Sequence, residues 1–199
     1  MSTSTPESEL PSHWTLPNTL TWLRILMIPA ILILFYLPYW WKDPAACAAF
    51  VLAGITDSLD GYYARKWGQT SRLGAFLDPV ADKLIVAAAL VLIVSQDPRW
   101  FLVIVAVVII GREIAVSALR EWMAEIGARG RIRVSIWGKY KTVMQIVGLS
   151  LLLFRHDLFG IPIYKLGLIL TGVAAVLTLW SMFLYLRLAW PELRGSAHL

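Results

Sequence analysis

TDSLDGYYARKWGQTSRLGAFLDPVADKL, residues 56–84, brings four aspartates together between two strongly apolar stretches of this 199-residue chain. The neighbouring stretches without charge, residues 44–56 and 84–96, are each 13 residues long. A helix needs about 20 residues to cross a membrane, so both helices must continue into the aspartate segment. Carboxylates at that depth are costly unless paired, hydrated or bound to a cation, so we expect a functional site. The four are Asp57, Asp60, Asp78 and Asp82.

The composition of the whole chain indicates a membrane protein. Hydrophobic residues make up 58% of it and charged residues 16%, whereas a soluble helical bundle of this length has too little interior for so many apolar side chains. We expect an all-α, polytopic membrane protein with six transmembrane helices, preceded by a short interfacial N-terminal helix. The predicted spans are residues 20–41, 44–65, 73–96, 99–120, 134–155 and 163–187.

One membrane domain is predicted to occupy residues 16–190, with a disordered polar tail at 1–15 and a C-terminal tail at 191–199. With six spans, both termini share a side with the loops after the second and fourth spans. That side holds 14 of the 18 Lys and Arg residues, which predicts that the termini and the aspartates are cytoplasmic. Nucleic-acid binding explains this charge less well, because the basic residues border spans and lie nearer lipid phosphates.

The spacing of the aspartates places each pair on one helix face. Asp57 and Asp60 are three residues apart, and Asp78 and Asp82 are four apart. If a tight reversal joins the two helices, the pairs face each other across adjacent helices. Four converging carboxylates repel one another unless divalent cations lie among them, and an all-oxygen donor set favours Mg²⁺ or Mn²⁺ over Zn²⁺.

The residues between the aspartates suit a nucleotide diphosphate. Gly61, Ala64 and Gly74 leave helix surfaces bare, so that a bulky ligand can approach the backbone. Arg65 follows Gly61 by one turn and can bind phosphate oxygens through its forked guanidinium.

Structural roles are the alternative explanation for the aspartates. Asp78 followed by Pro79 is typical of a helix N-terminus, and the other aspartate pair can neutralise Arg65 and Lys66. Neither role accounts for four carboxylates with three small residues placed between them.

From Asp57 to Asp82 the segment reads D-x2-D-G-x2-A-R-x8-G-x3-D-x3-D. This resembles the motif of the CDP-alcohol phosphatidyltransferases, six-span and usually dimeric membrane enzymes that displace CMP from a CDP-activated lipid with an alcohol. The resemblance implies a two-metal centre bound by Asp57, Asp60 and Asp78, with Asp82 as a further ligand or the catalytic general base. It also implies that the CDP portion is held by Gly61, Ala64, Arg65 and Gly74.

Basic residues in the second half form a candidate pocket for an acceptor that carries its own phosphate. Arg112 and Arg120 lie with Glu113 near the cytoplasmic end of the fourth span, and Lys139 and Lys141 lie at the start of the fifth. Serine or choline would need no such pocket. The alternatives are a generic positive-inside loop, preferred for the arginines of residues 129–133, and a salt-bridging role for Arg112.

Four stretches, LPNTLTWLRILMIP, GAFLDPVADKL, GREIAVSALREWMAEIG and GKYKT, resemble the bacterial branch of this family that makes phosphatidylglycerophosphate. This implies CDP-diacylglycerol as donor, sn-glycerol 3-phosphate as acceptor, Mg²⁺ as cofactor, and a homodimer in the inner membrane. Inositol phosphate, serine and phosphatidylglycerol are alternative acceptors. Asn18, Thr19 and Thr21 are predicted either to cap the short interfacial helix, with Arg24 reaching lipid headgroups, or to join Arg24 in nucleotide binding.

Two functions from other classes compete with the transferase. A divalent-cation transporter would place carboxylates near the middle of the membrane, often on broken helices, whereas these cluster at one end of the spans. A structural lipid-binding scaffold does not account for Asp82. The transferase is therefore the preferred hypothesis.

Overall fold

The computed structural model describes residues 16–67, 72–127 and 136–195, and every regular element within them is an α-helix. The all-α prediction is confirmed, and the helices coincide closely with the six predicted spans. The tail predicted at residues 1–15 lies outside the described residues. The helices are α1 (Leu16–Tyr36), α2 (Lys42–Trp67), α3 (Arg72–Gln96), α4 (Trp100–Glu125), α5 (Ile136–Phe154) and α6 (Ile163–Gly195).

The predicted separate interfacial helix is wrong for the described residues, because α1 runs from Leu16 to Tyr36 without a break. Pro17 lies in its first turn, where a missing N–H costs no helical hydrogen bond. Asn18, Thr19 and Thr21 therefore belong to the early turns of α1 and do not cap a helix of their own.

Prolines separate several of the helices. Pro38 lies between α1 and α2, Pro98 between α3 and α4, and Pro162 directly before α6. Pro79 instead lies inside α3, about two turns after that helix begins. The alternative that Asp78 caps a helix is therefore wrong.

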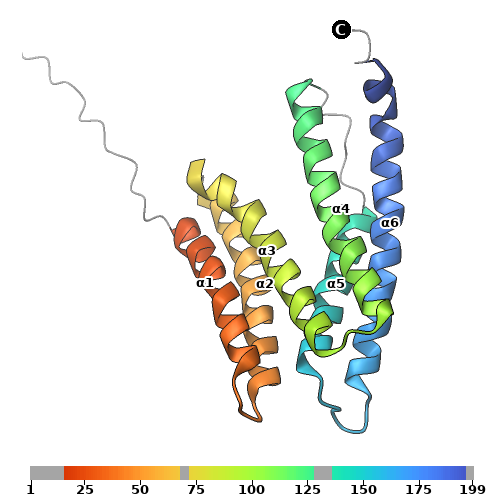
Figure 1. Cartoon of the computed structure of the whole chain (residues 1–199). Helices are drawn as coiled ribbons and strands as arrows, with labels where there is room; N and C mark the ends of the chain where they lie inside the picture. Colours follow the sequence, from red (N-terminus) through yellow and green to blue (C-terminus); the bar gives the residue numbers. More distant parts are fainter. Residues whose placement is uncertain (1–15, 68–71, 128–135, 196–199) are drawn as a thin grey trace, which may run out of the picture.

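The helices run alternately in opposite directions (Figure 1). The starts of α1, α3 and α5 and the ends of α2, α4 and α6 consequently lie at one end of the molecule, the upper end in Figure 1. α1 packs against α2 and α3, α5 packs against α6 and α2, and α4 packs against α6 and α3. Among the residues whose side chains are described, α2 and α3 make few contacts with each other. Within the described residues, the two helices that carry the aspartates are therefore joined mainly through α1. Most of the reversal between α2 and α3 lies outside the described side chains, so the predicted facing of the two aspartate pairs stays a prediction.

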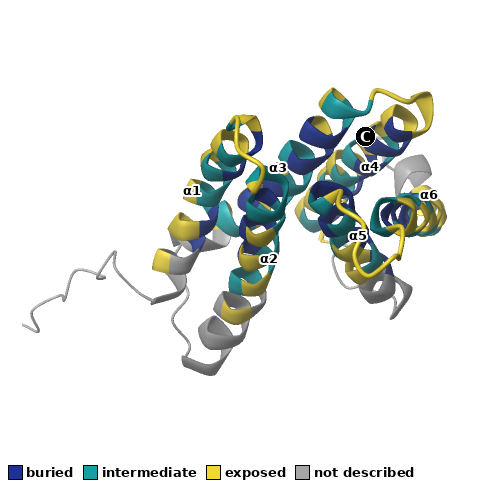
Figure 2. Ribbon diagram, turned by 90° about the horizontal axis from the view of Figure 1, so that it is seen from below, coloured by how far each residue is buried: buried dark blue, intermediate teal, exposed yellow. Residues whose placement is uncertain are grey.

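Each helix carries both buried and exposed residues (Figure 2), and large apolar residues are found among both. α4 over Trp100–Glu125 and α6 over Ile163–Pro191 are long and apolar enough to cross a membrane. Such outward apolar surface is unfavourable in water and suits a lipid environment. Buried core residues include Ile31, Phe35, Phe50, Leu90 and Leu102, and exposed ones include Ile33, Val91, Val107, Val176 and Phe183.

Polar contacts fix the opposite end of the bundle. Tyr164, at the start of α6, donates a hydrogen bond to Asp97 in the α3–α4 connection, and Arg99 Nε donates to Asp97 Oδ1 at 2.8 Å. The hydrogen-bonded Arg99 guanidinium lowers the pKa of Asp97 to about 2. These contacts hold the connection against α6, at the end remote from the aspartate segment.

Glycines permit the close approach of α5 and α6. A Cβ atom on Gly148 would lie 2.5 Å from Thr171 Oγ1 and 2.9 Å from the Thr171 backbone nitrogen, and one on Gly167 would lie 3.0 Å from Leu152. Two helices come this close only where small residues leave room.

Gly148→Ala is expected to lower the free energy of unfolding by about 1–3 kcal/mol, because the added methyl group must push α5 and α6 apart. Thermal unfolding of the purified protein in detergent measures the effect. Gly111→Ala is the matched control, since its new Cβ meets nothing within 4 Å, and it is expected to be neutral or slightly stabilising. Equal melting temperatures for the two variants would contradict this account of the packing.

Candidate active site

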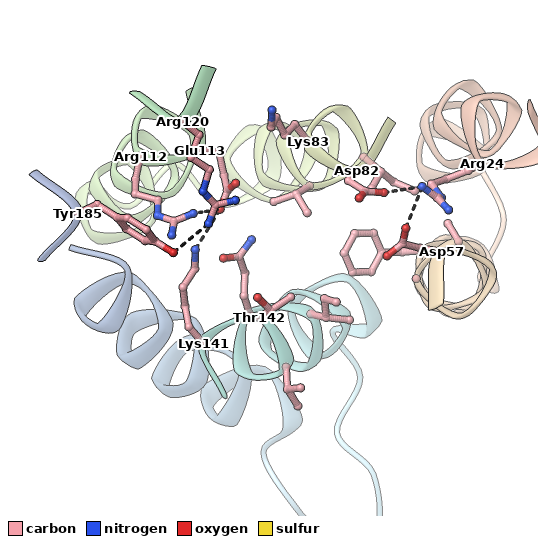
Figure 3. A pocket seen from close by; sticks show the side chains of 18 residues that line it. Arg24, Asp57, Asp82, Lys83, Arg112, Glu113, Arg120, Lys141, Thr142 and Tyr185 are labelled. Atoms are coloured by element: carbon pink, nitrogen blue, oxygen red, sulfur yellow. Dashed lines mark hydrogen bonds and ion pairs between the residues drawn. The ribbon is translucent and has the colours of Figure 1, made fainter. Parts of the chain in front are cut away.

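A cavity of about 590 Å³ lies between the helices, and all six contribute to its lining. Apolar side chains such as Phe50, Ile85 and Ile146 form part of the wall. Figure 3 shows two groups of charged side chains in the lining, with Lys83 of α3 apart from both. The acidic group contains Arg24, Asp57 and Asp82, and the basic group contains Arg112, Glu113, Arg120 and Lys141 with Tyr185.

The acidic group joins three helices. Arg24 Nη1 of α1 lies 3.0 Å from Asp57 Oδ1 of α2 and 2.5 Å from Asp82 Oδ1 of α3. The Arg24 side chain is 1% exposed, so the expectation that it reaches lipid headgroups is wrong. The side chains of Asp57 and Asp82 are 44% and 45% exposed. Both carboxylates are therefore paired with a buried cation and still accessible to a ligand.

A second contact ties α1 to α3. Thr21 Oγ1 donates a hydrogen bond to Asp78 Oδ1 at 2.6 Å. Thr21 and Arg24 are three residues apart on α1, and Asp78 and Asp82 are four apart on α3. Each pair thus projects from one helix face, and the two faces meet.

The acidic group offers carboxylate oxygens, the kind of donor that a hard divalent cation prefers. Asp57 and Asp82 each place an oxygen within 3.0 Å of the same Arg24 nitrogen, so carboxylates from two helices converge on one centre of positive charge. Oxygen ligands of this kind suit Mg²⁺. Among the side chains that the structure describes, no three Asp, Glu, His or Cys residues gather closely enough to hold a metal. Asp60 belongs to α2, but its side chain is outside the described set.

The basic group centres on Glu113. Its Oε1 atom accepts hydrogen bonds from Arg112 Nη1 at 2.8 Å and from Lys141 Nζ at 3.0 Å. The salt-bridging role considered for Arg112 is therefore present. Arg112 Nε is also buried and has no hydrogen-bond partner within residues 16–67, 72–127 and 136–195. An anion bound in the cavity would satisfy this donor.

Arg120 and Tyr185 extend the basic group from α4 to α6. Arg120 Nη2 donates to Tyr185 Oη at 2.9 Å, and its guanidinium carbon lies 5.2 Å from the centre of the Tyr185 ring. Arg112, Arg120 and Lys141 together outnumber the single carboxylate of Glu113. The excess positive charge is suited to a phosphate group.

Several predicted site residues have side chains outside the described set. Gly61, Ala64 and Arg65 belong to the last turns of α2, Gly74 to the first turn of α3, and Lys139 to the first turn of α5. Residues 128–135, which include three arginines of the basic loop, also lie outside the described residues. The roles assigned to all of these stay predictions.

Sequence interpretation assigned no role in the cavity to Tyr185 or Gln145. Tyr185 offers no signal, because a tyrosine within an apolar helix is ordinary. Gln145 did offer one, since a strongly polar side chain inside a membrane span is costly. The pairing of Arg24 with the aspartates was also missed, although a usable signal existed, since an arginine in a span requires a counter-charge.

Comparison with known proteins gives a consistent picture. A family model described as CDP-alcohol phosphatidyltransferase matches residues 14–183. Three curated relatives are each named CDP-diacylglycerol–glycerol-3-phosphate 3-phosphatidyltransferase. The Haemophilus influenzae protein is 49% identical over 94% of this chain and 99% of its own length. The Pseudomonas fluorescens protein is 51% identical over 90% of this chain and 92% of its own length. The Escherichia coli K12 protein is 47% identical over 91% of this chain and 98% of its own length.

Proposed function

The chain belongs to the CDP-alcohol phosphatidyltransferase family, and we propose that it transfers the phosphatidyl group of CDP-diacylglycerol to sn-glycerol 3-phosphate. The products are phosphatidylglycerophosphate and CMP. The names and the nearly complete coverage of the relatives support this donor and acceptor. The observation that carries the proposal is one cavity that pairs accessible Asp57 and Asp82 with the basic group around Lys141.

The basic group is the proposed binding site for the acceptor phosphate. Charge-assisted hydrogen bonds from arginine and lysine hold a phosphate strongly. Binding the phosphate there leaves the hydroxyl end of the acceptor free to extend toward the aspartates, in the same cavity. Positioning of this kind removes much of the entropic cost of bringing two substrates together. The proposed residues are Arg112, Arg120, Lys139 and Lys141.

Asp82 is the proposed general base. It accepts the proton of the acceptor hydroxyl while the hydroxyl oxygen forms a bond to the β-phosphorus of the donor. The bond between that phosphorus and the bridging oxygen breaks, and CMP leaves with its electron pair. Arg24 holds Asp57 and Asp82 in position and reduces their mutual repulsion. The acyl chains of the donor stay in the bilayer beside α2 and α3.

Members of this family generally use a divalent metal ion. For this chain we propose two Mg²⁺ ions, with Mn²⁺ as the alternative, held by Asp57, Asp60 and Asp78 with Asp82 as a further ligand. When bound, such ions neutralise negative charge on the diphosphate. The CDP portion is proposed to lie against Gly61, Ala64, Arg65 and Gly74.

The family and the apolar helices identify a membrane-associated enzyme. We propose that all six helices cross the inner membrane, with both termini and the cavity on the cytoplasmic side. The excess of basic residues at the end shared by the termini supports this orientation. A homodimer is proposed from the usual state of the family.

The acceptor is tested by measuring CMP release from the purified protein supplied with CDP-diacylglycerol and Mg²⁺. Release is expected with sn-glycerol 3-phosphate and not with serine or phosphatidylglycerol, because neither offers a phosphate monoester to the basic group. Inositol phosphate is also expected to be inactive, because the relatives are named for glycerol 3-phosphate as acceptor. Mass spectrometry of the lipid product identifies phosphatidylglycerophosphate. A reaction without acceptor measures background hydrolysis. Release with serine but not with sn-glycerol 3-phosphate would overturn the assignment.

A further inference from the structure

Gln145 presents a buried polar atom whose role the reaction described above does not explain. The residue lies on α5, lines the cavity and is only 5% exposed. Its Oε1 atom is buried and has no hydrogen-bond partner in the part of the chain that the structure describes. An unsatisfied buried amide oxygen is unfavourable, so such atoms usually have a partner. A ligand hydroxyl inside the cavity would supply the missing donor.

Gln145 lies on α5 between the basic group and the level of the acidic group. It follows Lys141 by four residues, so the two side chains project from the same face of the helix. Lys141 is hydrogen-bonded to Glu113 in the basic group. The next residue, Ile146, lies beside Gly54 of α2, where a Cβ atom would be 3.9 Å from its Cγ2. Gly54 precedes Asp57 by three residues, so Gln145 lies at the level where α5 faces the acidic group.

The polar groups of the proposed acceptor are arranged in the same order as the polar groups of the cavity. sn-Glycerol 3-phosphate carries a phosphate at one end, the attacking hydroxyl at the other, and one more hydroxyl on the carbon between them. With the phosphate at Lys141 and the attacking hydroxyl at Asp82, the middle hydroxyl needs an acceptor within the cavity. Among the described lining residues, the only buried side-chain oxygen without a hydrogen-bond partner is the amide oxygen of Gln145.

We infer that Gln145 Oε1 accepts a hydrogen bond from the middle hydroxyl of the acceptor. Gln145 is then a residue that determines acceptor specificity. This inference rests on the proposed function. Gln145 selects three-carbon phosphorylated polyols over phosphorylated alcohols that lack this hydroxyl. An acceptor without it leaves the buried oxygen unpaired, and a site built for a hydrogen bond rejects such an analogue.

The test compares two acceptors in the full-length enzyme with saturating CDP-diacylglycerol and Mg²⁺. One is sn-glycerol 3-phosphate, and the other is 3-hydroxypropyl phosphate, which keeps the phosphate and the terminal hydroxyl but lacks the middle one. For the unmodified chain, kcat/KM is expected to favour the first by about 10- to 100-fold. In Gln145→Leu the preference is expected to fall to within about threefold, while the KM for CDP-diacylglycerol stays unchanged. An undiminished preference in Gln145→Leu would overturn the inference.

Two further variants separate recognition from packing. Gln145→Glu keeps an oxygen at the same position and is expected to retain the preference, even if its added charge lowers the overall rate. Gln145→Met has a long unbranched side chain without that oxygen and replaces the leucine variant if the latter folds poorly. Ser150→Ala is the matched control, because Ser150 is a buried polar residue of α5 whose hydroxyl donates to Ile146 O. It is expected to keep the full preference, and its loss there would overturn the inference.

Failure of the proposed function and failure of the role of Gln145 give different experimental results. If the unmodified chain releases no CMP with sn-glycerol 3-phosphate, the proposed function fails and the role of Gln145 fails with it. If the unmodified chain turns over this acceptor but shows no preference against 3-hydroxypropyl phosphate, only the role of Gln145 is overturned.

Discussion

Asp82→Asn is expected to lower turnover by about 1,000-fold or more while leaving the affinity for CDP-diacylglycerol within a few-fold of its original value. The amide is nearly isosteric with the carboxylate but cannot take the proton of the acceptor hydroxyl, and loss of a general base costs roughly 100- to 10,000-fold. The KM of the acceptor should change little, because the basic group still binds its phosphate. CMP release measures turnover, and titration with the donor in the absence of acceptor measures binding.

Asp157→Asn is the control for the removal of a negative charge, because Asp157 is exposed in the α5–α6 connection at the opposite end of the bundle. It is expected to retain full activity. If Asp82→Asn abolishes donor binding altogether, Asp82 acts primarily as a metal ligand and the base must be another group. Unimpaired turnover in Asp82→Asn would contradict both roles.

Lys141→Ala or Arg112→Ala is expected to raise the KM of sn-glycerol 3-phosphate by about 10- to 100-fold, with a far smaller effect on the KM of CDP-diacylglycerol. Each substitution removes a charge-assisted hydrogen bond to the acceptor phosphate, worth about 1.5–3 kcal/mol. It also leaves Glu113 with one fewer cation, which adds repulsion against the incoming phosphate. Initial rates with each substrate varied in turn give both KM values.

Lys165→Ala serves as the matched control for this pair, since Lys165 is exposed at the start of α6, far from the cavity. Neither KM should change in that variant. Equal increases of the donor and acceptor KM in Lys141→Ala would indicate structural damage and would contradict an acceptor-specific role.

The sequence predicted the helices well because their physical signal is local. Runs of apolar residues long enough to span a membrane cannot be mistaken for connections, and prolines such as Pro38 and Pro98 lie where the runs are interrupted. The initial helix was predicted incorrectly because Asn18, Thr19 and Thr21 suggested the cap of a separate helix. A proline in the first turn of α1 is compatible with one continuous helix.

The site was only partly predictable, because its contacts join residues distant in the chain. The spacing of the aspartates indicated which helix face each pair occupies, and Asp57 and Asp82 do line one cavity. No local pattern shows that Arg24 pairs with Asp82, 58 residues away. In an apolar helix the lipid-facing and partner-facing sides look alike, so the face that α1 turns toward α3 is not evident from sequence.

The two explanations considered for Arg112 turn out to be compatible. Its Nη1 atom pairs with Glu113, as a salt bridge within α4 requires. Its Nε atom has no hydrogen-bond partner among the described residues, and the side chain lines the cavity. A charge buried in a membrane helix needs both structural support and a reason to be present. Glu113 provides the support, and the acceptor phosphate is the proposed reason.

The central claim is that α2 and α3 direct their aspartates toward shared divalent cations. Electron paramagnetic resonance of bound Mn²⁺ in the purified protein tests it without relying on activity. The account predicts two spin-coupled Mn²⁺ ions per chain in the presence of CDP-diacylglycerol. Both the binding of the ions and their spin coupling are expected to be lost in Asp57→Asn and retained in Asp157→Asn. Mn²⁺ binding that is absent from the unmodified chain, or that is unaffected by Asp57→Asn, would contradict it.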